Sequence, residues 1–260
     1  MKSISLALLA LCFTCAQAAV SVVDDSGKRV VLARPAQRVI SMAPHVTELV
    51  FAAGGGARIV GAMNYSDYPF EARMIPLIGS DSQIDLERVI ALRPDLLIVW
   101  QSGNTARQIA QLASLGIPVF HSEPRKLETV ATSLERFGRL LGTEKIAVPA
   151  AARLRAKVGS LRSRYGRRPP VSVFYQAWDN PLYTLNGEQI ASDAIRLCGG
   201  RNIFADLKTI APQVSVESVV QRDPEVILGG KLYTPQDRGL SIWQPFGGMT
   251  AVRRKNLFTL

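Results

Sequence analysis

The sequence predicts an α/β protein built from two Rossmann-like lobes with mainly parallel sheets, joined by a long rigid helix. The chain has 260 residues, of which 47% are hydrophobic, enough for the cores of two medium-sized domains. Strand-like apolar runs alternate with helical stripes, which is typical of a parallel sheet. The same helix–turn–strand pattern also occurs twice, at residues 84–100 and 214–230.

The repeated pattern puts one glutamate at an equivalent place in each copy, Glu87 and Glu217. In both copies a helical stripe follows, then a proline seven residues after the glutamate, an acidic residue and an apolar strand. A duplicated unit indicates two similar lobes, each carrying one of these acids. Two acids at matching places suit a partner with two-fold symmetry.

Residues 1–18 are predicted to be a signal peptide. A positively charged start precedes an apolar run over Ile4–Phe13 and a cleavage signal at Ala16–Ala18. The apolar run is too short to span a membrane, so we expect a soluble protein exported to the periplasm. The alternative is a lipid anchor at Cys12 or Cys15, although neither cysteine is preceded by a small residue after a suitable leucine.

An N-terminal α/β lobe is predicted over residues 19–124. Its expected strands are Arg38–Met42, Ile59–Met63 and Ile117–His121, and its expected helices are Thr47–Ala53 and 104–115. The first repeat adds a helix and a strand within 86–100. Gly54–Gly56 should close the first helix, because glycine tolerates the left-handed conformation of a helix C-cap. This alternation implies a mainly parallel sheet.

A helical linker is predicted over residues 125–168, with helices at Leu127–Leu141 and Glu144–Tyr165. Pro149 is expected to kink or restart the second helix. A flexible hinge would be rich in glycine and serine. A helical segment is a stiffer strut, so we expect the two lobes to move little against each other.

A C-terminal α/β lobe is predicted over residues 169–260. Its expected elements are a strand at Val171–Gln176, a helix at Ile190–Leu197, the second repeat, and a strand at Asn256–Leu260. Cys198 is the one cysteine outside residues 1–18, and a single thiol in an oxidising compartment indicates a missing disulfide partner. With the bare final strand, this predicts a chain truncated at its C-terminus. The alternative is that Cys198 is a buried free thiol.

The formal net charge of +10 falls to +9 without residues 1–18, with 30 basic against 21 acidic residues. A basic exported protein could favour an anionic ligand or surface. Much of the charge lies in the run Arg153–Arg168, which has no aromatic partner beyond Tyr165. We therefore interpret the run as a solvated helix face, and expect no nucleic-acid partner.

Motifs of catalysis are missing from the sequence. The chain has two histidines, His45 and His121, and neither HExxH, GxSxG nor, beyond residue 18, CxxC. We therefore expect no enzyme, no metal site and no resident cofactor. His121 ends a strand and is interpreted as structural. His45 lies at a strand-to-helix turn, the edge where open α/β sheets bind ligands, so it is a candidate for the cleft.

Aromatic residues cluster at predicted strand ends or in the loops that follow them: Tyr65, Tyr68, Trp100, Trp178 and Tyr183. If the lobes face each other, these side chains converge on one crevice, although each could instead pack locally. A buried aromatic contributes about 2–3 kcal/mol by area. An aromatic cleft suits a large, partly flat, partly apolar ligand.

Several short motifs carry a resemblance to a known family. They are Tyr65–Pro69, Leu86–Arg88 with Leu92–Asp95, Gly103-Asn104 with Gln111–Ile117, Cys198–Gly200 with Asn202–Phe204, and Pro212–Ser215. They resemble the substrate-binding proteins of cobalamin ABC importers, a class with a rigid helical backbone between two lobes. The resemblance covers Arg38 to the C-terminus and implies a corrinoid ligand, no catalysis and a monomer.

The resemblance also implies roles for single residues. Tyr65, Trp100 and Tyr183, the last a Phe in the family, match aromatics that contact cobalamin. Glu87 and Glu217 match the glutamates that pair with arginines on the permease dimer of the inner membrane.

Other positions depart from the family pattern. Cys198 matches a cysteine that bridges to one in a final helix, which this sequence lacks. Two tryptophans of the family cleft fall at Asp81 and Ala211, and Trp178 is a candidate to replace one of them. The ligand therefore stays open between cobalamin, another corrinoid, haem and a ferric siderophore. Haem would need an axial ligand such as His45 or Tyr65, and the basic charge mildly favours an anionic siderophore.

Overall fold

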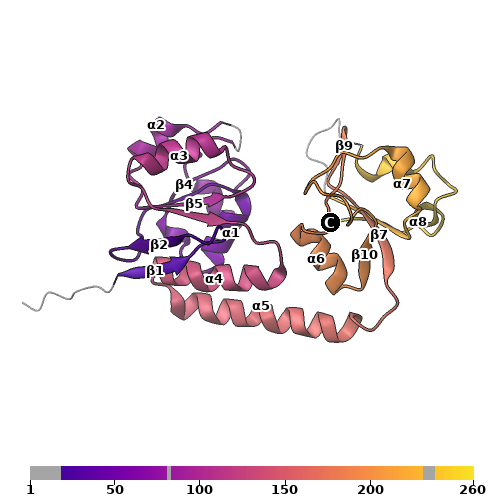
Figure 1. The fold of residues 1–260 in the computed structure, drawn as a ribbon, viewed down its shortest axis with the longest axis horizontal. Coiled ribbons are helices and arrows are strands. Elements are labelled where there is room, and N and C mark those ends of the chain that lie inside the picture. Colours follow the sequence, from indigo (N-terminus) through magenta and orange to yellow (C-terminus); the bar gives the residue numbers. More distant parts are fainter. Residues whose placement is uncertain (1–18, 81–82, 231–237) are drawn as a thin grey trace, which may run out of the picture.

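The computed structural model describes residues 19–80, 83–230 and 238–260. They form two α/β lobes that stand side by side, with helices α4 and α5 running along their base (Figure 1). The predicted signal peptide, Cys12, Cys15 and Asp81 lie outside the described residues. Within those residues, no helix is both long and apolar enough to cross a bilayer.

The N-terminal lobe holds a parallel sheet of strand order β4-β3-β5-β6, preceded by an antiparallel hairpin of β1 and β2. Its strands are β1 (Val20–Val23), β2 (Arg29–Leu32), β3 (Val39–Ser41), β4 (Ile59–Ala62), β5 (Leu96–Trp100) and β6 (Val119–Ser122). Its helices are α1 (Pro44–Ala52), α2 (Leu86–Ala91), α3 (Ala106–Ser114) and the short 3₁₀ turns η1 (Gly56–Arg58) and η2 (Phe70–Met74). Buried apolar clusters lie on both faces of this sheet.

The C-terminal lobe holds a second parallel sheet, of order β10-β7-β11-β12. Its strands are β7 (Val171–Gln176), β8 (Trp178–Asp179), β9 (Leu182–Tyr183), β10 (Gly200–Asn202), β11 (Val226–Gly229) and β12 (Leu257–Thr259). Its helices are α6 (Ile190–Leu197), α7 (Val216–Arg222), α8 (Thr250–Arg253) and η3 (Gly239–Trp243). The core gathers around Trp243, whose ring centroid lies 5.5 Å from that of Phe174.

The two sheets have the same topology. In each, the first strand is central, the second pairs on one side of it, and the third and fourth follow on the other side. The helix and strand of each repeat, α2–β5 and α7–β11, occupy equivalent places. The predicted pair of similar α/β lobes with parallel sheets is therefore confirmed.

The repeat encodes a helix with matched ends. Asp85 and Ser215 are the N-caps of α2 and α7, each accepting a hydrogen bond from the backbone N–H three residues later. At the other end Arg93 and Asp223 adopt positive φ angles of 46° and 39°, and a proline follows each. A left-handed residue followed by proline ends a helix abruptly, so both helices stop at the same point of the repeat.

The acid that follows each proline holds the first strand of its lobe. Asp95 accepts hydrogen bonds from the backbone N–H groups of Gln37 and Arg38, both at 2.8 Å, just before β3. Glu225 accepts from the backbone N–H of Ser172 at 2.9 Å, at the start of β7. These hydrogen bonds join the repeat to the central strand of each sheet.

Helices α4 (Leu127–Leu141) and α5 (Glu144–Tyr165) match their predicted bounds. Pro149 lies inside α5, which continues through it without the restart that was one predicted outcome. Gly54 packs against α5 and has a φ of 82°, and an added Cβ there would lie 2.6 Å from the side chain of Ile146. Glycine at this helix end therefore serves both the backbone turn and the close packing.

Some elements differ from the expectations. Helix α1 begins at Pro44 rather than at Thr47. Proline suits the first helical position because the backbone N–H that it lacks would have no partner within the helix there. The hairpin β1–β2 and strands β8, β9 and β10 were not predicted. They have two to four residues each, too few for hydrophobic periodicity to register. The boundaries of the lobes at 124 and 168 stay predictions.

Candidate functional site

A cavity of about 360 Å³ lies between the two lobes. The N-terminal lobe and the start of α4 contribute His45, Glu48, Leu49, Trp100, Ser102, Glu123, Pro124 and Val130, and the C-terminal lobe contributes Gln189, Ile190 and Ile210. The N-terminal residues come from α1 and from the segments after β5 and β6. These are the carboxyl ends of parallel strands, where α/β sheets bind ligands. The cavity is therefore the candidate ligand site.

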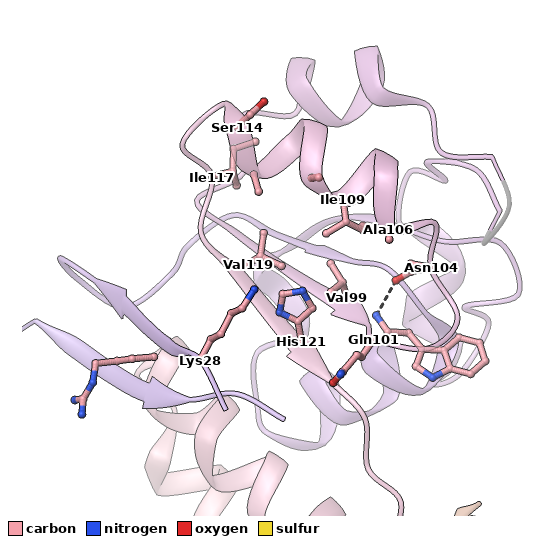
Figure 2. A pocket seen from close by; sticks show the side chains of 14 residues that line it. Lys28, Val99, Gln101, Asn104, Ala106, Ile109, Ser114, Ile117, Val119 and His121 are labelled. Carbon is pink, nitrogen blue, oxygen red and sulfur yellow. Dashed lines mark hydrogen bonds between the residues drawn. The ribbon is translucent and has the colours of Figure 1, made fainter. Parts of the chain in front are cut away.

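Trp100 is half-buried and is held by its own loop. Its backbone N–H donates to Asn104 Oδ1 at 2.7 Å, a bond drawn in Figure 2, and Asn104 Nδ2 donates to the Met42 carbonyl at 2.8 Å. The indole also covers Gly103, where an added Cβ would lie 1.9 Å from the ring. The Gly103-Asn104 pair thus sets the position of Trp100, a role that the sequence did not reveal.

His45 lies edge-on to Trp100, with ring centroids 5.6 Å apart and an interplanar angle of 83°. Burial lowers the pKa of the imidazole, and the charges of Glu123 and Asp25 only partly oppose that shift, so the ring is neutral at neutral pH. Its Nε2 atom is buried and has no hydrogen-bond partner among the described residues. His45 and Trp100 form one continuous wall of the cavity.

Tyr65 is strongly exposed, with 80% of its surface accessible, and sits in a turn with a φ of 66°. A buried hydroxyl chain supports that turn, in which Thr47 bridges Ser41 at 2.7 Å and Ser66 at 3.0 Å. Tyr65 and Trp100 together line a smaller hollow of about 250 Å³. A non-glycine residue with positive φ is costly and is typical of functional sites.

Two acidic residues that were not among the predicted site residues, Glu48 and Glu123, line the inter-lobe cavity. Glu123 accepts hydrogen bonds from the backbone N–H and the hydroxyl of Ser102, at 2.9 and 3.1 Å. Glu48 is exposed on α1, and its partial desolvation together with the charge of Asp67 raises its pKa. A lone acid on a helix is usually solvated, so only the position of Glu48 after a strand-to-helix turn could have indicated its location.

Trp178 and Tyr183 are cross-strand partners in the β8–β9 ribbon of the other lobe. β9 lies on the side of that lobe nearer the N-terminal lobe (Figure 1). Trp178 is 39% exposed and donates its indole N–H to the Asn180 carbonyl at 3.1 Å. Neither residue lines the hollows that contain Tyr65 and Trp100. Their contact with a ligand stays a prediction.

Glu87 and Glu217 are both exposed and occupy the second position of their helices. Helices α2 and α7 lie at the end of each lobe away from α5 (Figure 1). Hydrogen bonds from its own backbone N–H and from Ser215 hold the pKa of Glu217 below its usual range. The two helices that carry these glutamates thus lie on the same side of the molecule (Figure 1).

Cys198 is a free, exposed thiol at the C-terminal end of α6. It is therefore not the buried thiol of the alternative reading, and its disulfide stays a prediction. Across the described ranges, no group of three or more His, Cys, Asp or Glu side chains is arranged to hold a metal ion.

A larger hollow of about 540 Å³ lies wholly on the N-terminal lobe (Figure 2). Lys28 and His121 stand at one side of it, and Val119, Ile109 and Val99 form its apolar floor. His121 bonds through Nδ1 to Asp24 at 2.9 Å, as expected for a structural histidine. This hollow receives no residue from the other lobe.

Known proteins share this fold and much of the sequence. The family described as "Periplasmic binding protein" matches residues 39–260. The vitamin B12-binding protein of Yersinia pestis (strain Pestoides F) is 40% identical over 213 residues, covering 82% of this chain and 76% of that protein.

Solved structures agree. The periplasmic vitamin B12 binding protein BtuF of Vibrio cholerae superposes with a TM-score of 0.79 at 33% identity, over 87% of this chain and 88% of that one. A periplasmic heme binding protein of Pseudomonas aeruginosa has a TM-score of 0.76 at 23% identity, over 86% and 84%. The second similarity concerns the fold alone.

Proposed function

Because the chain belongs to the periplasmic binding protein family, we propose that it captures cobalamin or a related corrinoid between its lobes and delivers it to an ABC import permease. It acts in the periplasm as a monomer and carries its ligand without chemical change. In this proposal residues 19–124 and 169–260 are the two lobes, and 125–168 is the strut between them.

The inter-lobe cavity carries the proposal. Its N-terminal wall is made of Trp100 and His45, and the hollow beside it adds Tyr65. Flat aromatic surfaces suit the rim and face of a corrin ring. Ile190 and Ile210 supply apolar contact from the opposite lobe. Trp178 and Tyr183 contact the part of the ligand that extends out of the cavity along the C-terminal lobe.

Haem is the second candidate, because proteins of this fold include haem carriers. His45 Nε2 and the exposed Tyr65 are the candidate axial ligands. His45 Nε2 is buried against its surroundings, so it would have to turn before it could reach an iron. This cost favours the corrinoid.

A fluorescence titration distinguishes the candidates. Cyanocobalamin is expected to quench the Trp100 emission at the lowest concentration, ahead of haemin and a ferric siderophore. Trp100→Ala should weaken cyanocobalamin binding by about 2–3 kcal/mol, or roughly 30- to 150-fold. Absence of cyanocobalamin binding would contradict the proposal.

We further propose that Glu87 and Glu217 dock the protein on the permease. Their equivalent places in a duplicated unit match a membrane dimer with two-fold symmetry. Basic residues of the permease would pair with both carboxylates, and such pairs guide orientation and association rate. The two lobes then present one contact each.

Charge reversal tests the docking. Glu87→Lys combined with Glu217→Lys should abolish uptake into cells or proteoliposomes and leave the affinity for cyanocobalamin unchanged. Glu144→Lys, at the start of α5 and far from both helices, is the matched control. Normal uptake by the double variant would show that these acids do not dock.

A further inference from the structure

Among the described residues, the charged side chains that line the inter-lobe cavity are all acidic. Glu48 and Glu123 are the ionisable side chains there besides the neutral His45, and neither Lys nor Arg lines this cavity or the adjoining Tyr65 hollow. The chain as a whole carries a strong positive charge. The local and the global charge therefore point to opposite kinds of ligand.

The two carboxylates have room for further hydrogen bonds. The Glu48 carboxylate forms no hydrogen bond or ion pair with another described residue, and desolvation together with the charge of Asp67 raises its pKa. Each oxygen of Glu123 accepts one hydrogen bond from Ser102, which leaves a lone pair on each. On the facing lobe the Gln189 side-chain oxygen accepts from the Ala191 N–H at 2.6 Å. The wall thus offers hydrogen-bond acceptors to a bound molecule.

We propose that Glu48, with Glu123 beside it, selects ligands whose periphery carries amides and excludes ligands whose periphery carries carboxylates. This inference rests on the proposed function and specifies which corrinoids and tetrapyrroles the site admits. Amide N–H groups donate to the carboxylates. A ligand carboxylate at the same place meets a like charge, which weakens its binding.

The positive charge of α5 does not reverse this selection. Most of the basic run Arg153–Arg168 lies on α5, the helix along the base of the molecule below the lobes (Figure 1). Arg155 is already paired with Glu128 and Glu135. Exposed charges act weakly beyond a Debye length of ~8 Å at physiological salt. The nearest carboxylates therefore decide which ligand groups the cavity accepts.

The experiment measures the ratio of a protein's affinities for two ligands that share the corrin ring and differ at its side chains. The ligands are dicyanocobinamide, whose corrin side chains are amides, and dicyanocobyrinic acid, whose side chains are carboxylates. Cyanocobalamin and haemin are titrated in parallel. The proteins are the wild type, Glu48→Gln, Glu123→Gln and the remote control Glu144→Gln. Because each ratio is taken within one protein, a general loss of folding cancels.

The wild type should bind the amide ligand more tightly than the acid, and Glu48→Gln should narrow that ratio by about tenfold, equivalent to ~1.4 kcal/mol. Glu123→Gln should narrow it as well, and Glu144→Gln should leave it unchanged. An unchanged ratio in Glu48→Gln, with cyanocobalamin still bound, would overturn the inference and leave the proposed function standing.

Failure of the proposed function gives a different result from failure of the inference. If the wild type does not bind cyanocobalamin, the proposed function is wrong. Tight wild-type binding of haemin, which carries two carboxylates, would then overturn the inference too. Weak haemin binding that strengthens about tenfold in Glu48→Gln would support the inference alone.

Discussion

Trp100 shows how a single residue is prepared for binding. It ends β5, turns its ring over Gly103 and is anchored through Asn104, so its position is fixed before any ligand arrives. Pre-ordering of an aromatic side chain reduces the entropy lost on binding. The affinity of the site therefore depends on residues that do not touch the ligand.

Gly103→Ala tests this dependence. The new methyl group would lie 1.9 Å from the indole, so Trp100 must leave its place. We expect a loss of cyanocobalamin affinity of about tenfold or more, approaching that of Trp100→Ala. Gly159→Ala, where an added Cβ meets no atom within 4 Å, should bind normally. Isothermal titration calorimetry measures both, and equal affinities for the two variants would contradict the mechanism.

The predicted and the missed residues differ in a physical way. Tyr65, Trp100 and His45 follow strands, and large side chains at strand ends indicate a ligand edge from sequence alone. Glu48 is an exposed helix residue, and only the folded structure shows that it lines the inter-lobe cavity. Gly103 has no side chain to suggest a role, and its function is visible only once the ring above it is located.

At the scale of elements, the duplicated unit does more than the sequence indicated. The acids Asp95 and Glu225 were noted only as parts of a pattern, yet each ties its helix–strand unit to the central strand of its sheet. Helices α4, α5 and α6 have the bounds that were predicted, and in α4 buried side chains recur on one face over several turns. The two-residue strands β8 and β9 depend on tertiary pairing instead.

Removing either strand-holding acid should destabilise its own lobe. We expect Asp95→Ala and Glu225→Ala to lower the free energy of unfolding by about 1 kcal/mol each, because each removes hydrogen bonds made by a partly exposed carboxylate. Urea unfolding at pH 7 measures the change. Glu71→Ala, an exposed acid on η2, should change it little, and equal stability of all three variants would refute the role.

The effect of Glu225 should also depend on pH. Hydrogen bonds from Ser172 lower its pKa below the ordinary 4.5. A carboxyl group whose pKa is lower in the folded than in the unfolded protein stabilises the folded state at pH values above its unfolded-state pKa. This stabilisation is lost as the pH falls through the folded-state pKa. The gap between the wild type and Glu225→Ala should therefore close on acidification below pH 4.5. A gap that does not narrow as the pH falls below 4.5 would contradict this assignment.

At the scale of the whole molecule, α6 fastens the C-terminal lobe to the strut. Asp193 accepts a hydrogen bond from the Leu127 N–H at 2.9 Å, the first amide of α4, and Arg125 pairs with Glu188 at 3.0 Å. The first amides of a helix lack partners within it, so this bond caps α4 from the other lobe. The contact supports the expectation that the lobes move little.

Asp193→Ala should loosen this junction. We expect hydrogen exchange at the Leu127 amide to quicken about tenfold, equivalent to ~1.4 kcal/mol of lost protection. Asp206→Ala, which removes an acid paired with Arg222 inside the C-terminal lobe, is the control. Amide exchange followed by mass spectrometry measures both, and unchanged protection at Leu127 would show that the junction is held elsewhere.

The way the chain crosses between its sheets has a mechanical consequence. The N-terminal sheet uses residues 39–122 and the C-terminal sheet residues 171–259, so in the described part of the chain the covalent path passes between them once, through α4 and α5. A tension applied across the tips of α2 and α7 is then carried by that base alone. If a permease pulled the two tips apart, the bending stiffness of this one helical pair would oppose the movement.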